Sequence, residues 1–366
     1  GGGTGGHIFP AISIANALKQ KHGNCEILFV GAEGKMEMEK VPSAGYKIVG
    51  LPIRGLQRNF SKENLKFFSR LFKSLRKAKA IVKDFQPDAV VGVGGYASAA
   101  VVKVAAKRKV PTLLQEQNSY PGITNKILAK RAKTICVAYD NLERFFDNNK
   151  IVKTGNPVRS EVVDITGKKK AAFKHFGLDP NKKTVLIIGG SLGARTLNES
   201  LKGDIQMLID KDIQLIWQCG KMYLDNLKPI VDELNRPNIY LSDFVYKMDL
   251  AYAAADVIVS RAGAMSVSEV CLIGKPVILV PSPNVSEDHQ TKNAMALVDV
   301  LAAVLVKDVE AKAKLVPQII ELIEDNTWND TFWGVCDGRG MNILGELLME
   351  LRNSSYKSKV LEVIVQ

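Results

Sequence analysis

The sequence predicts two doubly wound α/β domains, each built on a parallel sheet that helices cover on both faces. Short, almost wholly apolar runs alternate with helical stretches, which is the pattern of parallel strands buried on both sides. With 366 residues, the chain is long enough for two domains of ordinary size. Each half also carries a glycine-rich turn before a predicted helix, where open α/β sheets commonly bind ligands.

The predicted strands and the domain boundary follow from this alternation. The strands of the first half are Cys25–Val30, Ala89–Val93, Pro111–Leu114 and Thr134–Ala138, and those of the second half are Thr184–Ile188, Ile213–Trp217, Val257–Ser260, Val277–Val280 and Ala302–Val306. The turn Asn156–Arg159 and a polar, lysine-rich stretch from Ser160 to Lys183 separate the two sets. We therefore predict domains of residues 1–157 and 158–366.

Both ends of the sequence depart from the pattern. The sequence opens inside a glycine turn, Gly1–Gly6, although such a turn should follow a strand that is normally central in its sheet. Either the sequence is truncated there or the first sheet is built without that strand, and we favour truncation. Residues 326–341 show no clear periodicity, Ile343–Leu351 fits a helix, and Val360–Val365 fits a strand or a helix end.

Charge and cysteine content restrict the class of protein. The formal net charge of +12 suggests an anionic partner such as nucleic acid, anionic lipid or a phosphate-rich substrate, although a soluble protein with a basic surface fits equally well. The five cysteines are scattered without a C-x-x-C pair, which disfavours zinc or a disulfide framework and favours a reducing cytosol. We find no apolar run of roughly 20 residues, no signal peptide and no nucleic-acid-binding motif.

Three glycine-rich turns precede predicted helices: Gly1–Gly6, Gly92–Ser98 and Gly189–Arg195. Each can direct backbone N–H groups at a helix start toward phosphate or developing negative charge. The alternative for each is a tight turn that uses glycine for its positive φ. The first satisfies G-x-G-x-x-G, with Glu33 able to bind a ribose, but the strand expected before a dinucleotide turn is missing. None matches the G-x-x-x-x-G-K-[ST] loop, which disfavours a kinase or ATPase.

Further motifs occur in order along the chain: Glu116-Gln117-Asn118, Gly155–Arg159, Arg261–Glu269, and Gln290 with Asn293-Ala294. Together with the glycine turns, and above all with Gly1–Pro10, they resemble the MurG family of bacterial glycosyltransferases over residues 1 to about 307. That family adds N-acetylglucosamine to the lipid-linked muramyl-pentapeptide precursor of peptidoglycan. The resemblance implies a GT-B fold, in which two doubly wound Rossmann-like domains face a central cleft. It also implies an inverting transfer with no metal or other cofactor.

The resemblance implies that residues 158–366 bind the donor, UDP-N-acetylglucosamine. Glu269 would accept hydrogen bonds from the ribose hydroxyls, Ser191 would bind the pyrophosphate, and Gln290 would bind the sugar. From the residues alone, a carboxylate favoured by the dipole at a helix N-terminus is the alternative for Glu269. The implied donor-site residues are Thr4, Gly5, Gly6, Asn118, Arg159, Ser191, Val245, Ala264, Met265, Ser266, Val267, Ser268, Glu269, Gln290 and Asn293.

Residues 1–157 would hold the acceptor, undecaprenyl-pyrophosphoryl-muramyl-pentapeptide, in contact with Gly94, Gly95 and Tyr96. His7 is the candidate base, because an imidazole titrates near neutrality. A histidine that caps the first helix is the alternative. Glu116 is the reserve base, or a residue that orients the base. The sequence departs from the family at Gln115, where many members have histidine, at Tyr246-Lys247, and from about residue 325 onward.

The stretch Leu65–Lys79 is predicted to be a strongly basic amphipathic helix. Such a helix can lie on an anionic leaflet, and the alternative is a core-packed helix with a solvated basic face. With the lipid acceptor that the resemblance implies, we predict a peripheral protein on the cytoplasmic face of the bacterial inner membrane. The predicted membrane contacts are Leu65, Phe68, Leu71, Phe72, Lys73, Leu75 and Arg76.

Three other functions stay open at this point. A related GT-B enzyme would use another lipid acceptor, such as diacylglycerol. A UDP-sugar epimerase would need no lipid, which leaves the apolar stripe of Leu65–Lys79 without a role. A non-catalytic homologue would only bind the nucleotide sugar. The predicted partners are therefore UDP-N-acetylglucosamine, the undecaprenyl-linked acceptor and an anionic membrane surface, with no nucleic acid.

Overall fold

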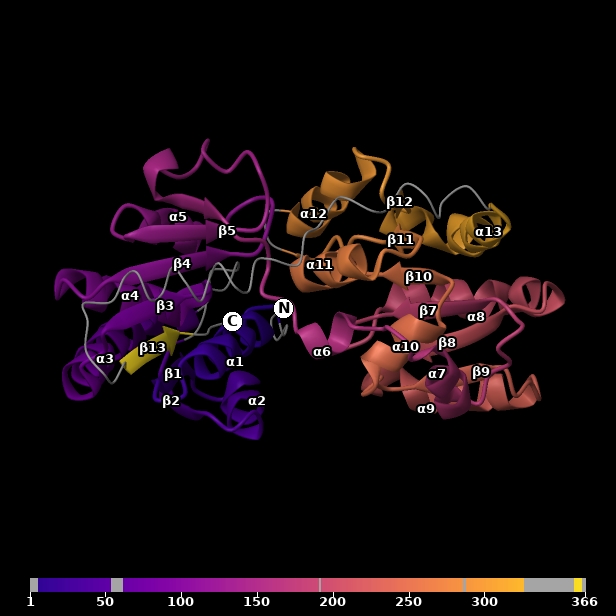
Figure 1. The fold of residues 1–366 in the computed structure, drawn as a ribbon, viewed down its shortest axis with the longest axis horizontal. Helices are drawn as coiled ribbons and strands as arrows, with labels where there is room; N and C mark the ends of the chain where they lie inside the picture. The colour runs from indigo at the N-terminus through magenta and orange to yellow at the C-terminus, as the bar shows by residue number, and fades with distance from the viewer. Residues whose placement is uncertain (1–5, 54–61, 191, 286–287, 326–358, 364–366) are drawn as a thin grey trace. The chain divides into compact units, whose positions relative to one another are not determined.

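The computed structural model describes residues 6–53, 62–190, 192–285, 288–325 and 359–363. The chain divides into two compact units, one formed by residues 1–158 with 338–366 and the other by residues 159–337. Each unit contains a parallel β-sheet covered by helices (Figure 1). The predicted pair of doubly wound α/β domains is therefore confirmed.

The first sheet has the strand order β2-β1-β13-β3-β4-β5-β6, and its neighbouring strands run parallel. Its strands are β1 (Glu26–Ala32), β2 (Lys47–Leu51), β3 (Ala89–Gly92), β4 (Thr112–Glu116), β5 (Thr134–Val137), β6 (Ile151–Lys153) and β13 (Lys359–Val363). The helices of this unit are α1 (Ile8–Lys21), α2 (Glu37–Ser43), α3 (Lys62–Phe85), α4 (Gly95–Lys107), α5 (Ile123–Ala129) and the 3-10 helix η1 (Asn148–Lys150).

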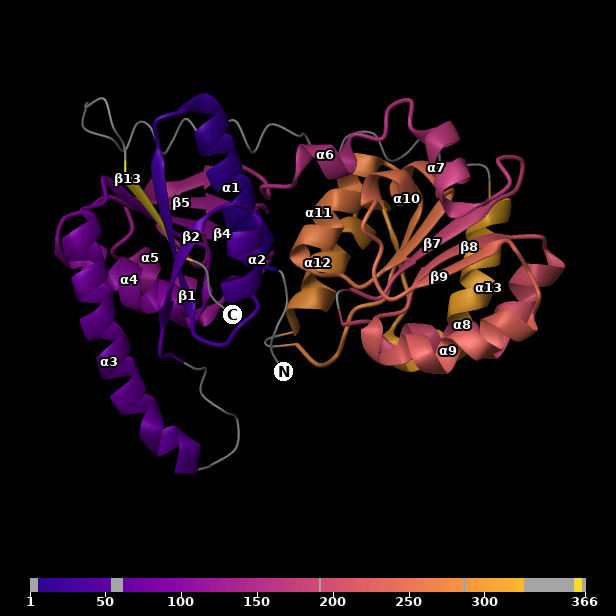
Figure 2. The same ribbon diagram turned by 90° about the horizontal axis from the view of Figure 1, so that it is seen from below.

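Both faces of the first sheet are buried, which explains its nearly continuous apolar strands. Successive residues of a strand point to opposite faces of the sheet. Val91 and Leu113 accordingly join an apolar cluster with α1, whereas Val90 and Leu114 join a cluster with α3, α4 and α5. The two views show α1 and α3 on opposite sides of this sheet (Figures 1 and 2).

A glycine turn such as Gly1–Gly6 should follow a strand at the centre of its sheet, and no strand precedes it in the sequence. In the structure, β13 occupies that central position. This strand comes from the far end of the sequence, lies between β1 and β3, and pairs in parallel with both. The segment expected to be a strand or a helix end is thus a strand. It belongs to the first unit, and so the predicted second domain, 158–366, is wrong at its C-terminal end. The helix predicted over Ile343–Leu351 lies outside the described residues.

The second sheet has the order β12-β11-β10-β7-β8-β9, again with parallel neighbours. Its strands are β7 (Thr184–Ile188), β8 (Gln214–Gln218), β9 (Ile239–Ser242), β10 (Val257–Ser260), β11 (Val277–Leu279) and β12 (Val304–Leu305). The helices are α6 (Ser160–Val163), α7 (Lys169–Phe176), α8 (Arg195–Asp210), α9 (Lys221–Glu233), α10 (Met248–Ala254), α11 (Ala264–Ile273), α12 (His289–Val298), the 3-10 helix η3 (Asp308–Glu310) and α13 (Ala311–Glu324). Trp217 is fully buried, and it joins residues of α8, α9 and α13 in one apolar cluster.

We expect Leu361→Pro to lower the stability of the first unit, because proline removes a backbone N–H from a strand that is paired on both sides. The lost hydrogen bond and its unsatisfied acceptor should cost on the order of 1–3 kcal/mol. Leu361→Val keeps the N–H and is the matched control. Urea unfolding followed by circular dichroism measures both variants. Equal midpoints for the two would contradict the described pairing of β13.

Candidate functional site

Parallel strands bring their carboxyl ends to one edge of a sheet, and ligand-binding loops collect there. In the first unit, His7 lies at this edge as the residue before α1. Its Nδ1 lies 3.0 Å from Oε1 of Gln117, which follows β4. Its ring also lies against Gly94, where a Cβ would come within 2.9 Å of the His7 Cε1 atom. The first two glycine-turn segments therefore meet at the imidazole.

The hydrogen bonds of Gln117 determine which nitrogen of His7 carries the proton. Gln117 Nε2 donates to the carbonyl oxygen of Val93 at 3.0 Å and to that of Gln115 at 3.1 Å, and it also contacts Gln115 Oε1. With its amide nitrogen committed to acceptors, Gln117 turns its oxygen toward His7. That oxygen can only accept, so Nδ1 of the neutral imidazole is protonated and Nε2 is the basic nitrogen.

The predicted alternative for His7, a side-chain cap on the first helix, is wrong. The His7 side chain makes no capping hydrogen bond to α1. Its imidazole is held instead by Gln117, a residue that our list of site residues did not include. Gln115 supports the arrangement from the core, because its Nε2 donates to Asn156 Oδ1 at 3.1 Å while Asn156 Nδ2 donates to the Gln117 carbonyl at 3.0 Å.

Glu116 is a buried anchor for the loop after β4, with 1% of its surface exposed. Oε1 accepts hydrogen bonds from the backbone N–H and the side-chain amide of Asn118, at 3.0 and 3.1 Å. Oε2 accepts from the Gly122 N–H at 3.1 Å and from Asn125 Nδ2 at 2.9 Å. Burial raises the pKa of this carboxyl, while these hydrogen bonds oppose the rise. The expectation that Glu116 is a reserve base is therefore not supported, because its carboxylate is enclosed and committed.

The remaining site residues predicted in the first unit are only partly described. Gly94 and Gly95 have φ values of +108° and +78°, which suit glycine, and Tyr96 beside them is 37% exposed. Asn118 faces Glu116, as given above. Gly6 begins the described part of the turn, whereas Thr4 and Gly5 lie outside the described residues.

In the second unit, the glycine turn after β7 packs tightly against the end of β8. A Cβ on Gly193 would lie 2.1 Å from the carbonyl oxygen of Cys219, and Gly190 and Gly193 both have positive φ. Only glycine allows this approach. The turn leads directly into α8, so its backbone lies at a helix N-terminus of the kind that binds phosphate. Ser191, predicted to bind the pyrophosphate, lies outside the described residues.

Glu269 is the sixth residue of α11 and not part of its first turn. The helix-dipole alternative is therefore weak, since that effect falls off within one turn. Its Oε2 accepts a hydrogen bond from the phenol of Tyr252 at 3.0 Å. Burial raises the pKa of Glu269, whereas the nearby charge of Arg159 and the phenol lower it. The site thus joins a predicted carboxylate and arginine to a tyrosine that sequence reasoning missed.

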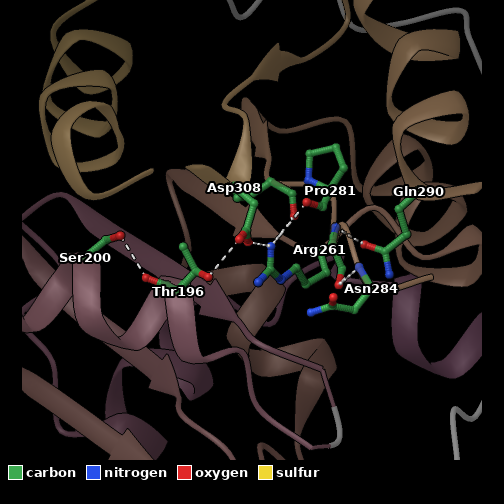
Figure 3. Close-up of polar contacts among 9 residues, drawn as sticks. Thr196, Ser200, Arg261, Pro281, Asn284, Gln290 and Asp308 are labelled. Carbon is green, nitrogen blue, oxygen red and sulfur yellow. Dashed lines mark hydrogen bonds and ion pairs between the residues drawn. The ribbon is translucent and has the colours of Figure 1, made fainter. Parts of the chain in front are cut away.

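Arg261, at the end of β10, connects several loops at the same sheet edge (Figure 3). Its Nη1 donates to the carbonyl oxygens of Val280 and Pro281, at 3.0 and 3.3 Å, and to Asp308 Oδ1 at 2.5 Å. Thr196 Oγ1, in the first turn of α8, donates to the other oxygen of Asp308 at 3.0 Å. Arg261 and Asp308 are mostly buried, with side chains 14% and 18% exposed. Sequence reasoning missed Asp308, which carries no local motif.

Several residues predicted to bind the donor instead make hydrogen bonds within the protein near this sheet edge. Gln290 Oε1 accepts from the Ser282 N–H at 2.8 Å. Asn293, which the resemblance placed in the donor site, is fully buried and donates to the Ala262 carbonyl at 3.4 Å, so the structure does not expose it to a donor. Val267 is 1% exposed and its N–H donates to Gly263, and Val245 is buried with its N–H bonded to Gln218. The partly exposed members of the predicted set on α11 are Ala264, Met265, Ser266, Ser268 and Glu269.

The residues of the basic helix α3 that were predicted to contact a membrane fall into buried and exposed groups. Leu71 and Leu75 pack against the core of the first unit, so their assignment to the membrane face is wrong. Phe72 is 70% exposed, and Lys73 and Arg76 are exposed beside it. The side chains of Leu65 and Phe68 lie outside the described part of the chain. No helix among the described residues is sufficiently long and apolar to span a bilayer, and no described cluster of His, Cys, Asp or Glu could hold a metal.

Two models of one family match the chain. The glycosyltransferase family 28 N-terminal domain matches residues 1–137, and the corresponding C-terminal domain matches residues 184–330. The UDP-N-acetylglucosamine–N-acetylmuramyl-(pentapeptide) pyrophosphoryl-undecaprenol N-acetylglucosamine transferase of Parabacteroides distasonis is 55% identical over 326 residues, covering 89% of each chain. The transferase of the same name from Bacteroides thetaiotaomicron is 55% identical and covers 89% of this chain and 88% of that protein.

Solved structures give the same fold. MurG of Acinetobacter baumannii superimposes with a TM-score of 0.72 at 26% identity, covering 95% of this chain and 97% of that one. The two doubly wound Rossmann-like domains that the resemblance implied are thereby confirmed. A UDP-GlcNAc 2-epimerase of Methanocaldococcus jannaschii has a TM-score of 0.55 at 17% identity, covering 89% and 99% of the two chains. That likeness shows the fold alone.

We expect Glu116→Gln to loosen the loop after β4, because an amide NH2 would replace one of two oxygens that face only donors. The loss should be about 2–4 kcal/mol, as for removing charged hydrogen bonds from a buried group. Glu143→Gln, on the exposed surface, is the control. Urea unfolding gives the stability, and amide hydrogen exchange at Asn118 and Gly122 gives the local effect. Unchanged exchange at both amides would contradict the anchoring role.

Proposed function

The chain belongs to glycosyltransferase family 28, and we propose that it moves N-acetylglucosamine from UDP-N-acetylglucosamine to muramyl-pentapeptide-pyrophosphoryl-undecaprenol. This is the step from lipid I to lipid II in peptidoglycan synthesis. The proposal rests on the match to the N-acetylglucosamine transferases of Parabacteroides distasonis and Bacteroides thetaiotaomicron, which spans both units of the chain. We assign the donor to the second unit and the acceptor to the first.

The second unit offers the chemistry that a nucleotide diphosphate sugar requires. The carboxylate of Glu269 can accept hydrogen bonds from ribose hydroxyls, because among the described residues a single donor binds it, at Oε2. The glycine turn before α8 supplies backbone N–H groups and a helix dipole for the pyrophosphate. Arg261 commits Nη1 to the protein, and among the described residues Nε and Nη2 have no hydrogen-bond acceptor, so they can donate to phosphate oxygens.

The reaction replaces one bond at the anomeric carbon by another. The acceptor hydroxyl oxygen attacks that carbon, the bond to the β-phosphate oxygen breaks, and UDP leaves with the electron pair. The transition state has oxocarbenium character. His7 Nε2 takes the proton of the attacking hydroxyl, and the hydrogen bond from Nδ1–H to Gln117 stabilises the imidazolium that forms. The charge that develops on UDP is met by the glycine turn and Arg261.

The first unit also suits attachment to an anionic membrane. The exposed face of α3 combines Phe72 with Lys73, Arg76 and Lys79, and each basic residue near such a surface adds about 1 kcal/mol. Lys77 is less suitable, because it forms an ion pair with Glu33 at 2.9 Å. We infer that the protein binds peripherally at the cytoplasmic face, where its lipid acceptor is anchored.

Transfer of labelled sugar from UDP-N-acetylglucosamine to a short-chain analogue of lipid I, in the presence of EDTA, tests the function. Wild type should be active without metal. His7→Ala should reduce kcat by about 10²–10⁴, which is the contribution of a general base. His22→Ala, at the other end of α1, should retain activity. A requirement for divalent metal, or full activity of His7→Ala, would contradict the mechanism.

Binding of UDP-N-acetylglucosamine should weaken as the pH falls. Burial raises the pKa of Glu269. As the pH falls, its carboxylate is therefore protonated at a higher pH than an ordinary glutamate and loses acceptor capacity. The nucleotide sugar is a diphosphate diester and does not itself titrate in this range. Glu269→Gln should bind more weakly, and its affinity should not vary with pH. Calorimetry between pH 4.5 and 8 measures both. The same slope in both variants would contradict the assignment.

Reversal of the exposed charges of α3, by Lys73→Glu, Arg76→Glu and Lys79→Glu together, should release the protein from vesicles of anionic lipid. The partition coefficient should fall by at least about a hundredfold, from three lost attractions of about 1 kcal/mol each. The control is the triple reversal of Lys170, Lys174 and Lys202, which are exposed on the second unit. Equal co-sedimentation of the two triple variants would count against a membrane face on α3.

A further inference from the structure

We propose that Tyr252 is a positioning residue for nucleotide recognition, whose buried phenol holds the Glu269 carboxylate in the orientation that accepts the ribose hydroxyls. The inference rests on the proposed nucleotide site of the second unit. Tyr252 lies on α10 and is 1% exposed, so it does not itself meet a ligand. Its role would be exerted entirely through Glu269.

The contact fixes one oxygen and leaves the other available. The Tyr252 hydroxyl donates to Glu269 Oε2 at 3.0 Å. Glu269 Oε1 accepts no hydrogen bond from the part of the chain that the structure describes. Each carboxylate oxygen has two acceptor positions, so Oε1 and the second position of Oε2 remain for two neighbouring hydroxyls. A cis-diol such as that of ribose presents two donors side by side and matches this pattern.

A competing charge explains why the carboxylate needs to be held. The charge of Arg159 acts on both Glu269 and Tyr252, so the guanidinium lies near enough to attract the carboxylate. A glutamate side chain has three rotatable bonds, and without a fixed partner it would turn toward the cation. A carboxylate paired with arginine has fewer acceptor positions for a ligand. The phenol opposes this rearrangement by binding Oε2 from a fixed place.

The helix that carries the phenol is secured at both ends. At its start, Asp249 accepts from Lys168 Nζ at 2.8 Å, with both side chains partly buried. At its end, Lys275 Nζ donates to the carbonyl oxygens of Tyr252, Ala253 and Ala255, at 2.6, 3.1 and 2.5 Å. A cation at a helix C-terminus satisfies carbonyls that otherwise lack partners. Tyr252 is therefore placed by the scaffold and not by the ligand.

Tyr252→Phe separates positioning from packing, because it removes the hydroxyl and keeps the ring. Calorimetry with UDP and with 2′,3′-dideoxyuridine diphosphate, which lacks both hydroxyls, gives the readout. We expect the affinity for UDP to fall about tenfold, the effect of roughly one hydrogen bond. The affinity for the dideoxy compound should change less than about twofold. The ratio of the affinity for UDP to that for the dideoxy compound should therefore fall nearly as much as the affinity for UDP.

Two further variants complete the test. In a Glu269→Ala background, Tyr252→Phe should cause no additional loss of UDP affinity, because the group that it positions is gone. Tyr46→Phe removes another buried phenol, whose hydroxyl donates to Asn16 at 2.7 Å in the first unit, and should leave both affinities unchanged. Thermal unfolding of each variant verifies that it is folded.

The possible outcomes distinguish this inference from the proposed function. If wild type prefers UDP and Tyr252→Phe keeps the same preference, the positioning role is wrong while the nucleotide site stands. An equal loss for both compounds shows a structural role only and likewise overturns the inference. If wild type does not bind UDP, the proposed function fails together with the inference.

Discussion

A parallel sheet that is buried on both faces leaves the loops at the carboxyl ends of its strands as the natural place for polar chemistry. Both units of this chain obey that constraint. The strand interiors are filled by residues such as Val90, Val91 and Leu186, which are fully buried. His7 in the first unit, and Glu269 and Arg261 in the second, lie beyond strand ends. Each group therefore depends on neighbouring loops and helices for its orientation.

The structure divides the polar residues of the motifs into those that can meet a ligand and those that hold them. Gln117 sets the protonation of His7, Asp308 holds Arg261, and Tyr252 holds Glu269. These supporting contacts are partly buried, where an unsatisfied polar group would be costly. A motif therefore contains supporting residues as well as ligand contacts. Glu116, which binds three donors in the loop after β4 and one on α5, is the clearest example.

Local sequence patterns were sufficient for the fold class, most strand positions and the glycine turns, because each depends on neighbouring residues. They could not show that β13 belongs to the first sheet, because its partners β1 and β3 are distant from it in the sequence. Asp308 could not be identified as a site residue for the same reason, since it is 47 positions from its partner Arg261. In α3, helical spacing could not tell that Leu71 and Leu75 face the core while Phe72 faces outward. The roles of Glu116 and Asn293 required knowing how deeply each is buried.

The central claim is that the carboxyl-end loops of the second sheet bind the nucleotide sugar. Hydrogen–deuterium exchange with and without UDP-N-acetylglucosamine tests it directly. We expect slower exchange in the turn after β7, in the β10–α11 segment up to Glu269, and around Ser282 and Gln290. The loops at the opposite edge of that sheet should not change. Protection confined to the first unit, near Gly94 and His7, would contradict the claim.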